Sequence, residues 1–369
     1  MPFTITQNGQ ALSPTKYSWD AVNRIFSSSE SDLVLDFSNE KSITFELEDS
    51  CNLKCGSHCT ISAGSNCIFD TGNHCKFHLN GIGGTFVTGS SCKFDTMDEC
   101  EFITGSNCEF DTGDNCTFDT SFSCIFKAGG NCSFTTGHSC SFSALSGCIF
   151  NTENNCAFTS IDMCTFDTGD DCSFSVQDNC VLYSGEKCKY RLGRYCVIYS
   201  GDHSNFQMKS NCVIYAGEGC DFVAEEECTF NTEDLCGFHT KEKCIFKTTS
   251  NCRFYTGDDC TFDVEYKCVF DTGKRCVVVR RDVYEIHPLD GTKIIELNDI
   301  RVPGYKQIGT KTIQTQGNLG LPIPNTTQKP ITGTTQKPTT QTVIGRPART
   351  YKYIKDKRKE AFDRAMKGI

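Results

Sequence analysis

An eight-residue unit, Cys-x-Phe-x-Thr-Gly-x-x, repeats with constant spacing from Cys92 to Cys276 and constrains the fold more than any other feature. One extra residue in the stretch 81–84 shifts the phase, and the unit then continues back to Cys51. Of the 28 cysteines, only Cys55 lies outside the first position of the unit. Two such positions lack cysteine and hold Gly84 and Ser204. This strict period indicates that one short element is stacked on itself many times.

Each unit combines the alternation of a strand with the chemistry of a turn. In one unit, Cys116, Phe118 and Thr120 have the same parity and therefore share one face of a strand. The positions between them carry polar side chains that belong in water. The Thr-Gly-x-Asn stretch that follows is typical of a turn, because glycine and asparagine tolerate positive φ. We therefore expect a strand of about five residues and a corner of about three.

Three units that read Cys-Val-(Leu/Ile)-Tyr-(Ser/Ala)-Gly indicate how many units form one coil. They begin at Cys180, Cys196 and Cys212, a spacing of 16 residues, and the units between them differ. This superperiod predicts two units per coil. The expected fold is an all-β, two-sided parallel β-solenoid with two sheets face to face. Inward phenylalanines then form two stacks, and burial of each is worth about 2 kcal/mol or more.

The cysteines have three interpretations. Disulfides are the first, although stacked parallel side chains are poorly aimed for them. Zinc is the second, but only Cys51, Cys55, His58 and Cys59 form a local cluster, and the repeat spacing lacks the close ligand pairs of structural zinc sites. In the third, cysteine is a small core residue beneath phenylalanine. The first residues do not resemble a signal peptide, so we expect buried, reduced thiols, with no metal or cofactor.

We expect the solenoid to cover residues 51–276 and residues 1–50 to cap its N-terminal end, since an open end would expose a strand edge. The apolar pattern predicts a short helix over Trp19–Phe26. The segments 33–37 and 43–47 are interpreted as degenerate rungs with aliphatic residues in place of cysteine.

The C-terminal part of the chain changes character twice. Residues 277–310 are expected to form a β cap, in which the turn Pro288–Gly291 and the strand Lys293–Leu297 predict a hairpin. Residues 311–346 are rich in Thr, Gln, Pro and Gly and are expected to form an extended linker. Residues 347–369 are expected to form a basic amphipathic helix, because apolar side chains recur there at helical spacing.

The predicted helix leaves three alternatives open: a solvated helix, docking of its apolar face into a partner protein, or binding of nucleic acid or another anionic surface by its basic side. Residues 343–369 carry nine Lys or Arg and three Asp or Glu, so the rest of the chain has a net charge of −16. The candidate contact residues in this helix are Tyr351, Ile354, Lys355, Lys357, Arg358, Lys359, Phe362 and Met366.

No catalytic constellation is recognisable in the sequence, because the seven histidines follow no paired motif and the aspartates recur at outward repeat positions. The strongest surface signal is a Val-Tyr strip, expected on three successive rungs of one sheet. Such apolar strips mark contacts, either with another segment of this chain or with a partner or second copy. The strip consists of Val181, Tyr183, Val197, Tyr199, Val213 and Tyr215.

The tandem units, for example Asn66-Cys67-Ile68-Phe69-Asp70-Thr71-Gly72, resemble repeat proteins of giant DNA viruses of algae and amoebae. Two later segments resemble the ending of those proteins. They are Cys276-Val277-Val278-Val279-Arg280-Arg281-Asp282, where the chain leaves the repeat, and Ile300-Arg301-Val302-Pro303-Gly304-Tyr305. The resemblance covers about residues 50–308 and implies a viral origin. It carries no active-site residues over to this chain.

These observations favour a non-enzymatic structural protein of a large DNA virus. We expect a minor capsid or virion-associated protein, present in the host cytoplasm during assembly, that bridges or reinforces other virion proteins or associates with itself. The alternative is a binding module that presents one solenoid face to a host-cell protein. No apolar run in the sequence is long enough to cross a membrane.

Overall fold

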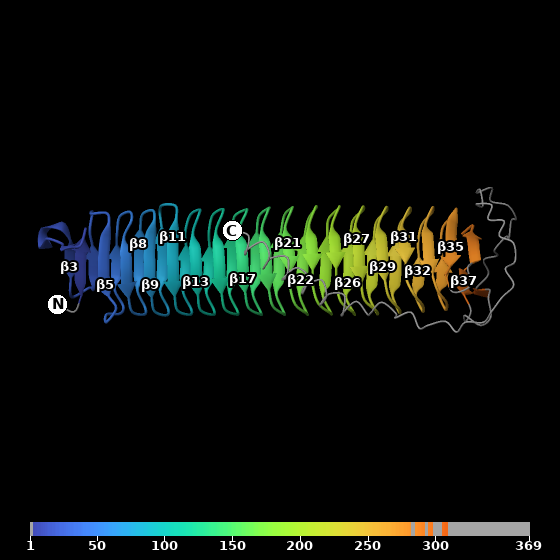
Figure 1. The fold of residues 1–369 in the computed structure, drawn as a ribbon, viewed down its shortest axis with the longest axis horizontal. Helices are drawn as coiled ribbons and strands as arrows, with labels where there is room; N and C mark the ends of the chain where they lie inside the picture. Colours follow the sequence, from blue (N-terminus) through green and yellow to red (C-terminus); the bar gives the residue numbers. More distant parts are fainter. Residues whose placement is uncertain (1–2, 282–284, 292–293, 298–304, 309–369) are drawn as a thin grey trace, which may run out of the picture.

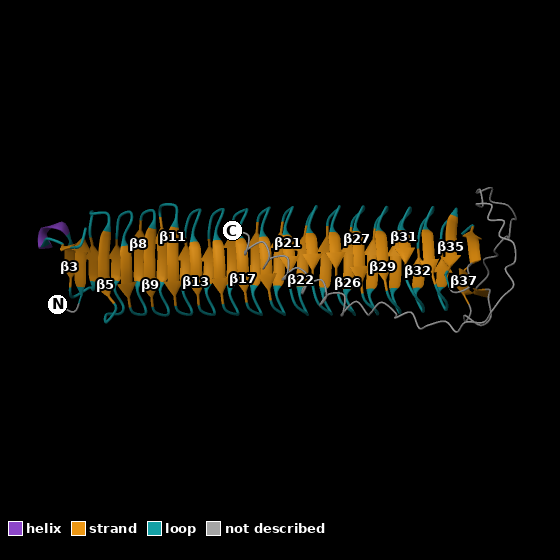
Figure 2. Cartoon of the chain, in the orientation of Figure 1, coloured by secondary structure: helices purple, strands orange, loops and turns teal. Residues whose placement is uncertain are grey.

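The computed structural model describes residues 3–281, 285–291, 294–297 and 305–308 and shows a long rod of stacked coils (Figure 1). Almost all regular structure in these residues is strand, and the one helical turn is the 3-10 helix η1, Pro14–Lys16, at the N-terminal end (Figure 2). Each coil contributes one strand to each of two sheets, here called sheet A and sheet B. The predicted two-sided β-solenoid is therefore confirmed.

From β4 to β35 the strands of sheet A and sheet B alternate along the chain, whereas the strands at the two ends occur in consecutive pairs. Sheet A consists of β1 (Thr4–Gln7), β2 (Gln10–Ala11), β5 (Leu33–Phe37), β7 (Asn52–Cys55), β9 (Cys67–Thr71), β11 (Gly84–Thr88), β13 (Glu101–Thr104), β15 (Thr117–Thr120), β17 (Ser133–Thr136), β19 (Ile149–Thr152), β21 (Thr165–Asp167), β23 (Val181–Tyr183), β25 (Val197–Tyr199), β27 (Val213–Ala216), β29 (Thr229–Thr232), β31 (Ile245–Lys247), β33 (Thr261–Val264), β35 (Cys276–Arg280) and β36 (Glu285–Leu289). Sheet B consists of β3 (Ser18–Asp20), β4 (Ile25–Ser27), β6 (Thr44–Glu46), β8 (Thr60–Ala63), β10 (Lys76–Leu79), β12 (Lys93–Asp95), β14 (Glu109–Asp111), β16 (Ile125–Ala128), β18 (Ser141–Ala144), β20 (Ala157–Ser160), β22 (Ser173–Val176), β24 (Lys189–Leu192), β26 (Asn205–Met208), β28 (Asp221–Ala224), β30 (Gly237–Thr240), β32 (Arg253–Tyr255), β34 (Val269–Asp271), β37 (Ile294–Leu297) and β38 (Tyr305–Ile308).

Parallel pairing in strict register joins each coil to the next. Phe102 pairs with Phe118, and Phe118 pairs with Phe134, so equivalent residues lie 16 apart in the sequence. The offset is 17 where Phe69 pairs with Phe86, because the corner that contains residues 81–83 holds the extra residue found in the sequence. Successive units therefore alternate between the two sheets along the whole repeat.

The core consists of two columns of buried aromatic rings, one from each sheet. Within a column, neighbouring rings are nearly parallel, as in Phe118 and Phe134, whose ring centroids lie 4.7 Å apart. Between the columns, rings meet edge to face, as in Phe118 and Phe126 at 5.3 Å and 78°. Both arrangements are favourable for aromatic pairs. The rung spacing of a sheet thus coincides with the stacking distance of the rings.

The cysteine side chains line the corners of the core. All 28 cysteines are buried and unpaired. The sulfur of each repeat cysteine lies close to a carbonyl of its own corner and, in most coils, to one of the preceding coil; for Cys132 these are Gly130 O at 3.4 Å and Gly113 O at 3.5 Å. A hydrogen bond with the Cys244 thiol raises the pKa of Cys260 to about 11, with burial acting in the same direction. The Cys260 thiol therefore stays protonated at neutral pH.

The corners depend on two backbone devices. The residue before the cysteine adopts positive φ in almost every unit, as the sequence predicts for Asn115 (φ 59°). The residue two before the cysteine caps the next coil: Asp98 Oδ1 accepts a 2.9 Å hydrogen bond from the N–H of Asp114. A Cβ on Gly113 would lie 1.9 Å from Asp98 Oδ1, so glycine is needed at that position to admit the cap.

The helix predicted over Trp19–Phe26 is wrong, because this segment forms an antiparallel hairpin. Strands β3 and β4 pair with Trp19 opposite Phe26. Asp20 Oδ1 accepts hydrogen bonds from the N–H groups of Val22 and Asn23, at 2.9 and 3.0 Å, and so stabilises the turn between the strands. The segments 33–37 and 43–47 contain β5 and β6, which pair in parallel with the next rungs, β7 and β8.

The prediction that the turn Pro288–Gly291 closes a hairpin with the strand Lys293–Leu297 is wrong, because the strands on either side of this turn do not pair with each other. Strand β36 folds back on β35 in sheet A, whereas β37 pairs antiparallel with β34 in sheet B and then with β38. The turn Pro288–Gly291 therefore leads from one sheet to the other. The predicted linker 311–346 and helix 347–369 lie outside the described residues.

Thiol burial predicts a clear labelling pattern. Iodoacetamide at about pH 8 should modify few cysteines of the folded chain, because all of the thiols are buried and out of reach of the reagent. In denaturant without reductant, all 28 should react, as counted by intact-mass spectrometry. Labelling of the unfolded chain that requires reductant would contradict the unpaired thiols of the structure.

The positive-φ corner positions predict a simple stabilising change. Leu235 has a φ of 61° and a side chain that is 60% exposed, so it bears the left-handed strain without contributing to the core. Leu235→Asn should stabilise the rod by roughly 1 kcal/mol, measured as a higher urea midpoint. The reverse change at an equivalent corner, Asn115→Leu, should lower the midpoint by a similar amount, and equal midpoints for all three proteins would contradict the argument.

Candidate partner-contact surface

The Val-Tyr strip lies where the sequence predicts it, on the outer face of sheet A. In strands β23, β25 and β27 the valines pair with one another and the tyrosines pair with one another. The three tyrosine rings form an almost parallel stack, with centroid distances of 4.8 Å from Tyr183 to Tyr199 and 4.7 Å from Tyr199 to Tyr215. The strip is therefore a continuous aromatic and aliphatic surface three rungs long.

The rungs on either side of the strip carry smaller, more polar side chains. Strand β21 presents Thr165 and Asp167, and strand β29 presents Thr229 and Asn231. The bulky side chains of the strip thus begin and end abruptly along sheet A. Other rungs of sheet A carry at most one exposed aliphatic side chain beside a polar one, such as Ile149 beside Asn151, and fold without an outward tyrosine.

The core beneath the strip is also altered. In sheet A the usual phenylalanine is replaced by Leu182, Ile198 and Ile214, all fully buried. In sheet B the same coils carry Leu192 and Met208 where most other coils have threonine, serine, alanine or valine, and both are buried. The lost aromatic volume in one sheet is thereby offset by larger side chains in the other, as dense packing requires.

A buried polar network occupies the centre of the same coils, and sequence reasoning missed it. Tyr190 takes the place of phenylalanine, and its hydroxyl contacts Ser184 and donates a 2.9 Å hydrogen bond to Ser200. Ser200 continues the network to Ser204 at 3.0 Å, and Ser204 Oγ accepts a hydrogen bond from the N–H of Cys188. Desolvation raises the pKa of Tyr190 well above its ordinary value, so its hydroxyl stays neutral.

Two features of the sequence could have indicated this network. Ser204 is one of only two positions where the repeat lacks its cysteine, and Tyr190 breaks a run of phenylalanines. Each looks like a conservative replacement when the repeat is read one unit at a time. The network becomes visible only when the two sheets are placed face to face.

The other predicted site residues are not brought to the strip by the described structure. The candidate residues of the C-terminal helix lie outside the described residues, and their role stays a prediction. Within the described residues, no group of three metal-ligating side chains could hold a metal ion. At the cluster considered for zinc, the His58 ring stacks on His74 with centroids 4.9 Å apart.

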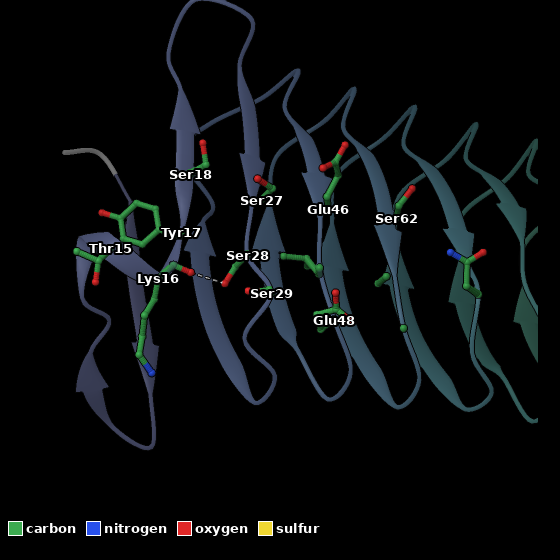
Figure 3. A pocket seen from close by; sticks show the side chains of 14 residues that line it. Thr15, Lys16, Tyr17, Ser18, Ser27, Ser28, Ser29, Glu46, Glu48 and Ser62 are labelled. Carbon is green, nitrogen blue, oxygen red and sulfur yellow. Dashed lines mark hydrogen bonds between the residues drawn. The ribbon is translucent and has the colours of Figure 1, made fainter.

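A groove of about 730 Å³ lies beside the N-terminal hairpin (Figure 3). Ser27 of β4 and Glu46 of β6 are neighbours in sheet B beside this groove, and Lys16 is paired with Glu30 at 3.0 Å. Ser28 donates its hydroxyl to the carbonyl of Lys16. No serine of this groove hydrogen-bonds to a carboxylate or histidine among the described residues, so a nucleophile paired with a base is lacking there.

Comparison of the chain with family models, with curated proteins and with solved structures finds no match. No helix in the described part of the chain is long and apolar enough to span a membrane. The strip, with the altered core behind it, is thus the feature that best distinguishes one part of this rod from the rest.

The buried network predicts an unusual mutational result. Tyr190→Phe restores the common residue of the repeat, yet it should destabilise the rod by about 1–3 kcal/mol because Ser184 loses its buried hydrogen-bond partner. Urea unfolding followed by circular dichroism measures the effect.

Phe222→Tyr, two rungs away in the same column, is the matched control. It adds the same hydroxyl where Ala216 stands at the position equivalent to Ser184, and it should also destabilise the rod. A gain in stability for Tyr190→Phe would contradict the role assigned to the network.

Proposed function

We propose that this chain is a non-enzymatic structural protein of a large DNA virus particle, in which the solenoid is a rigid element that joins other virion proteins. The observation that carries the bridging role is the Val-Tyr strip. Outer face, core and buried polar network change together over the same three coils. The resemblance of the repeat to proteins of giant DNA viruses supports the viral part of the proposal.

The rod has the mechanical properties that a spacer needs. Every coil from β5 to β35 is joined to the next by strand pairing in both sheets, and the side chains between the sheets are packed without a break in the core. Bending such a rod would separate rungs and break several hydrogen bonds at once. A contact on the strip would therefore hold its partner at a fixed distance from both ends.

Ion pairs along the surface support a role as a soluble spacer with few adhesive sites. On sheet B, Lys93 pairs with Glu109 at 2.6 Å and Lys127 pairs with Asp111 at 2.7 Å. Such exposed pairs contribute little stability, but they leave a hydrated surface. The other exposed apolar side chains of the rod mostly lie singly beside polar ones, so a continuous aromatic strip favours a specific contact over non-specific adhesion.

The test is the composition of purified virus particles. Quantitative mass spectrometry should find this chain in a fixed ratio to the major capsid subunit, and the ratio should survive detergent and protease treatment. Absence from particles, with expression in infected cells, would remove the structural role and favour a module that binds a host protein.

The strip can be tested in the same setting. Tyr183→Asp with Tyr199→Asp should reduce incorporation into particles at least about tenfold, because a charge in an apolar contact is costly to desolvate. Thr135→Asp with Asn151→Asp, at the same outward offset on β17 and β19, is the control and should be incorporated normally. Equal incorporation of both variants would show that the strip is not the contact.

A further inference from the structure

Sheet B contains a trough on the face opposite the strip. Strands β18, β20 and β22 present only small side chains outward, whereas β16 and β24 present long ones at the two ends. A groove of about 630 Å³ overlaps these strands and continues past Lys189 and Arg191 of β24 as far as β28. The outward side chains of the trough are Ser141, Ser143, Ala157, Thr159, Ser173 and Ser175.

The three tyrosines of the strip form a ridge that matches this trough in length and period. The ridge spans three rungs and is bordered by smaller side chains, while the trough spans three rungs and is bordered by larger ones. Both repeat at the same interval because strand pairing sets the rung spacing in both sheets. Three rings can therefore face three rungs of another rod without losing register.

We propose that the tyrosine ridge of one copy of this chain seats in the trough of a second copy. The inference rests on the proposed function, because it takes the strip as a contact surface and identifies a second copy of this chain as the molecule that binds it. The Ser, Thr and Ala side chains let the facing sheet approach closely. Their hydroxyls can hydrogen-bond to the tyrosine hydroxyls, which therefore need not lose hydrogen bonds on burial.

Positive charge at one end of the trough supports binding of a second copy. Strand β24 places Lys189 and Arg191 outward, and among strands β5–β35 no other has Lys or Arg at both outward positions. Neither cation forms an ion pair with a described residue, although Lys127 at the other end is paired with Asp111. An unpaired cation pair beside a trough suits aromatic ring faces and acidic side chains, which the ridge and its border provide.

The same charges select an orientation. If the two rods lie antiparallel, β27, β25 and β23 of one copy cover β18, β20 and β22 of the other. The next strand, β21, then brings Asp167 over Lys189 and Arg191. In the parallel arrangement β29 would instead place the uncharged Thr229 and Asn231 over the two cations. Electrostatic complementarity therefore favours antiparallel neighbours.

The proposed contact is heterologous, because the ridge and the trough lie on opposite faces of each rod. After two copies join, one ridge and one trough remain available, so further copies can add in a stack. The contact covers only a few rungs and falls at the small end of specific interfaces. Association should therefore depend on protein concentration, and its electrostatic part should weaken with salt.

The test uses the full-length chain in sedimentation velocity over a range of concentrations. Wild type should form dimers and larger species. A ridge variant, Tyr183→Asp with Tyr199→Asp, and a trough variant, Ala157→Arg with Ser173→Arg, should each weaken association at least about tenfold. All four positions are outward, so circular dichroism should show an unchanged fold.

Mixing the two variants distinguishes this proposal from its rivals. The ridge variant keeps an intact trough and the trough variant keeps an intact ridge, so the mixture should form one-to-one dimers and nothing larger. Thr135→Asp with Asn151→Asp on sheet A, and Thr60→Arg with Ser62→Arg on sheet B, are the controls and should behave as wild type.

Three results would overturn the inference. The first is a wild-type chain that stays monomeric at every concentration, including the case in which residues 309–369 cover the ridge. The second is association that the trough variant leaves intact, which would indicate a ridge-to-ridge contact. The third is a mixture of variants that stays monomeric while wild type associates. Particle composition tests the proposed function separately, so a failure here leaves that result standing.

Discussion

The rest of the structure depends on strand pairing at one repeated interval. The backbone ladder sets the distance between rungs, and aromatic rings stack favourably at nearly that distance, so the core and the sheets reinforce each other. Each corner must then carry the chain from one sheet to the other within three or four residues. This requirement explains the left-handed residue before each cysteine, the aspartate or asparagine caps, and the glycines that make room for those caps. Even the sulfur positions follow, because they lie beside corner carbonyls of successive coils.

Regularity on this scale makes exceptions informative. In a globular protein, a tyrosine in place of a phenylalanine or a serine in place of a cysteine would pass as ordinary variation. Here Tyr190 and Ser204 depart from a pattern that holds over most of the chain, and they contact the same network. The strip on one face and the cation pair on the other belong to the same group of coils. This coincidence of departures is the physical reason for treating these coils as a contact region.

Sequence reasoning predicted the repeat architecture well, because parity and period are local properties. The parity of Cys116, Phe118 and Thr120 is enough to assign an inner face, and the spacing of the Val-Tyr units is enough to assign two units per coil. It failed where the period ends. Trp19 and Phe26 are spaced as on a helix, but they face each other across a hairpin whose turn is held by Asp20. The trough and the buried network were missed because both depend on neighbours 16 residues apart in sequence or on the opposite sheet.

The alternation of units between sheets also governs how such a protein can change its length. Adding or removing 16 residues inserts or deletes one whole coil and leaves every later side chain on its original face. Adding or removing a single unit of eight keeps the local pattern intact, yet it transfers everything that follows to the opposite sheet. A ridge would then emerge where a trough had been. Insertions and deletions therefore preserve the surface of this rod only when they comprise a whole 16-residue coil, although the repeat in the sequence is eight residues long.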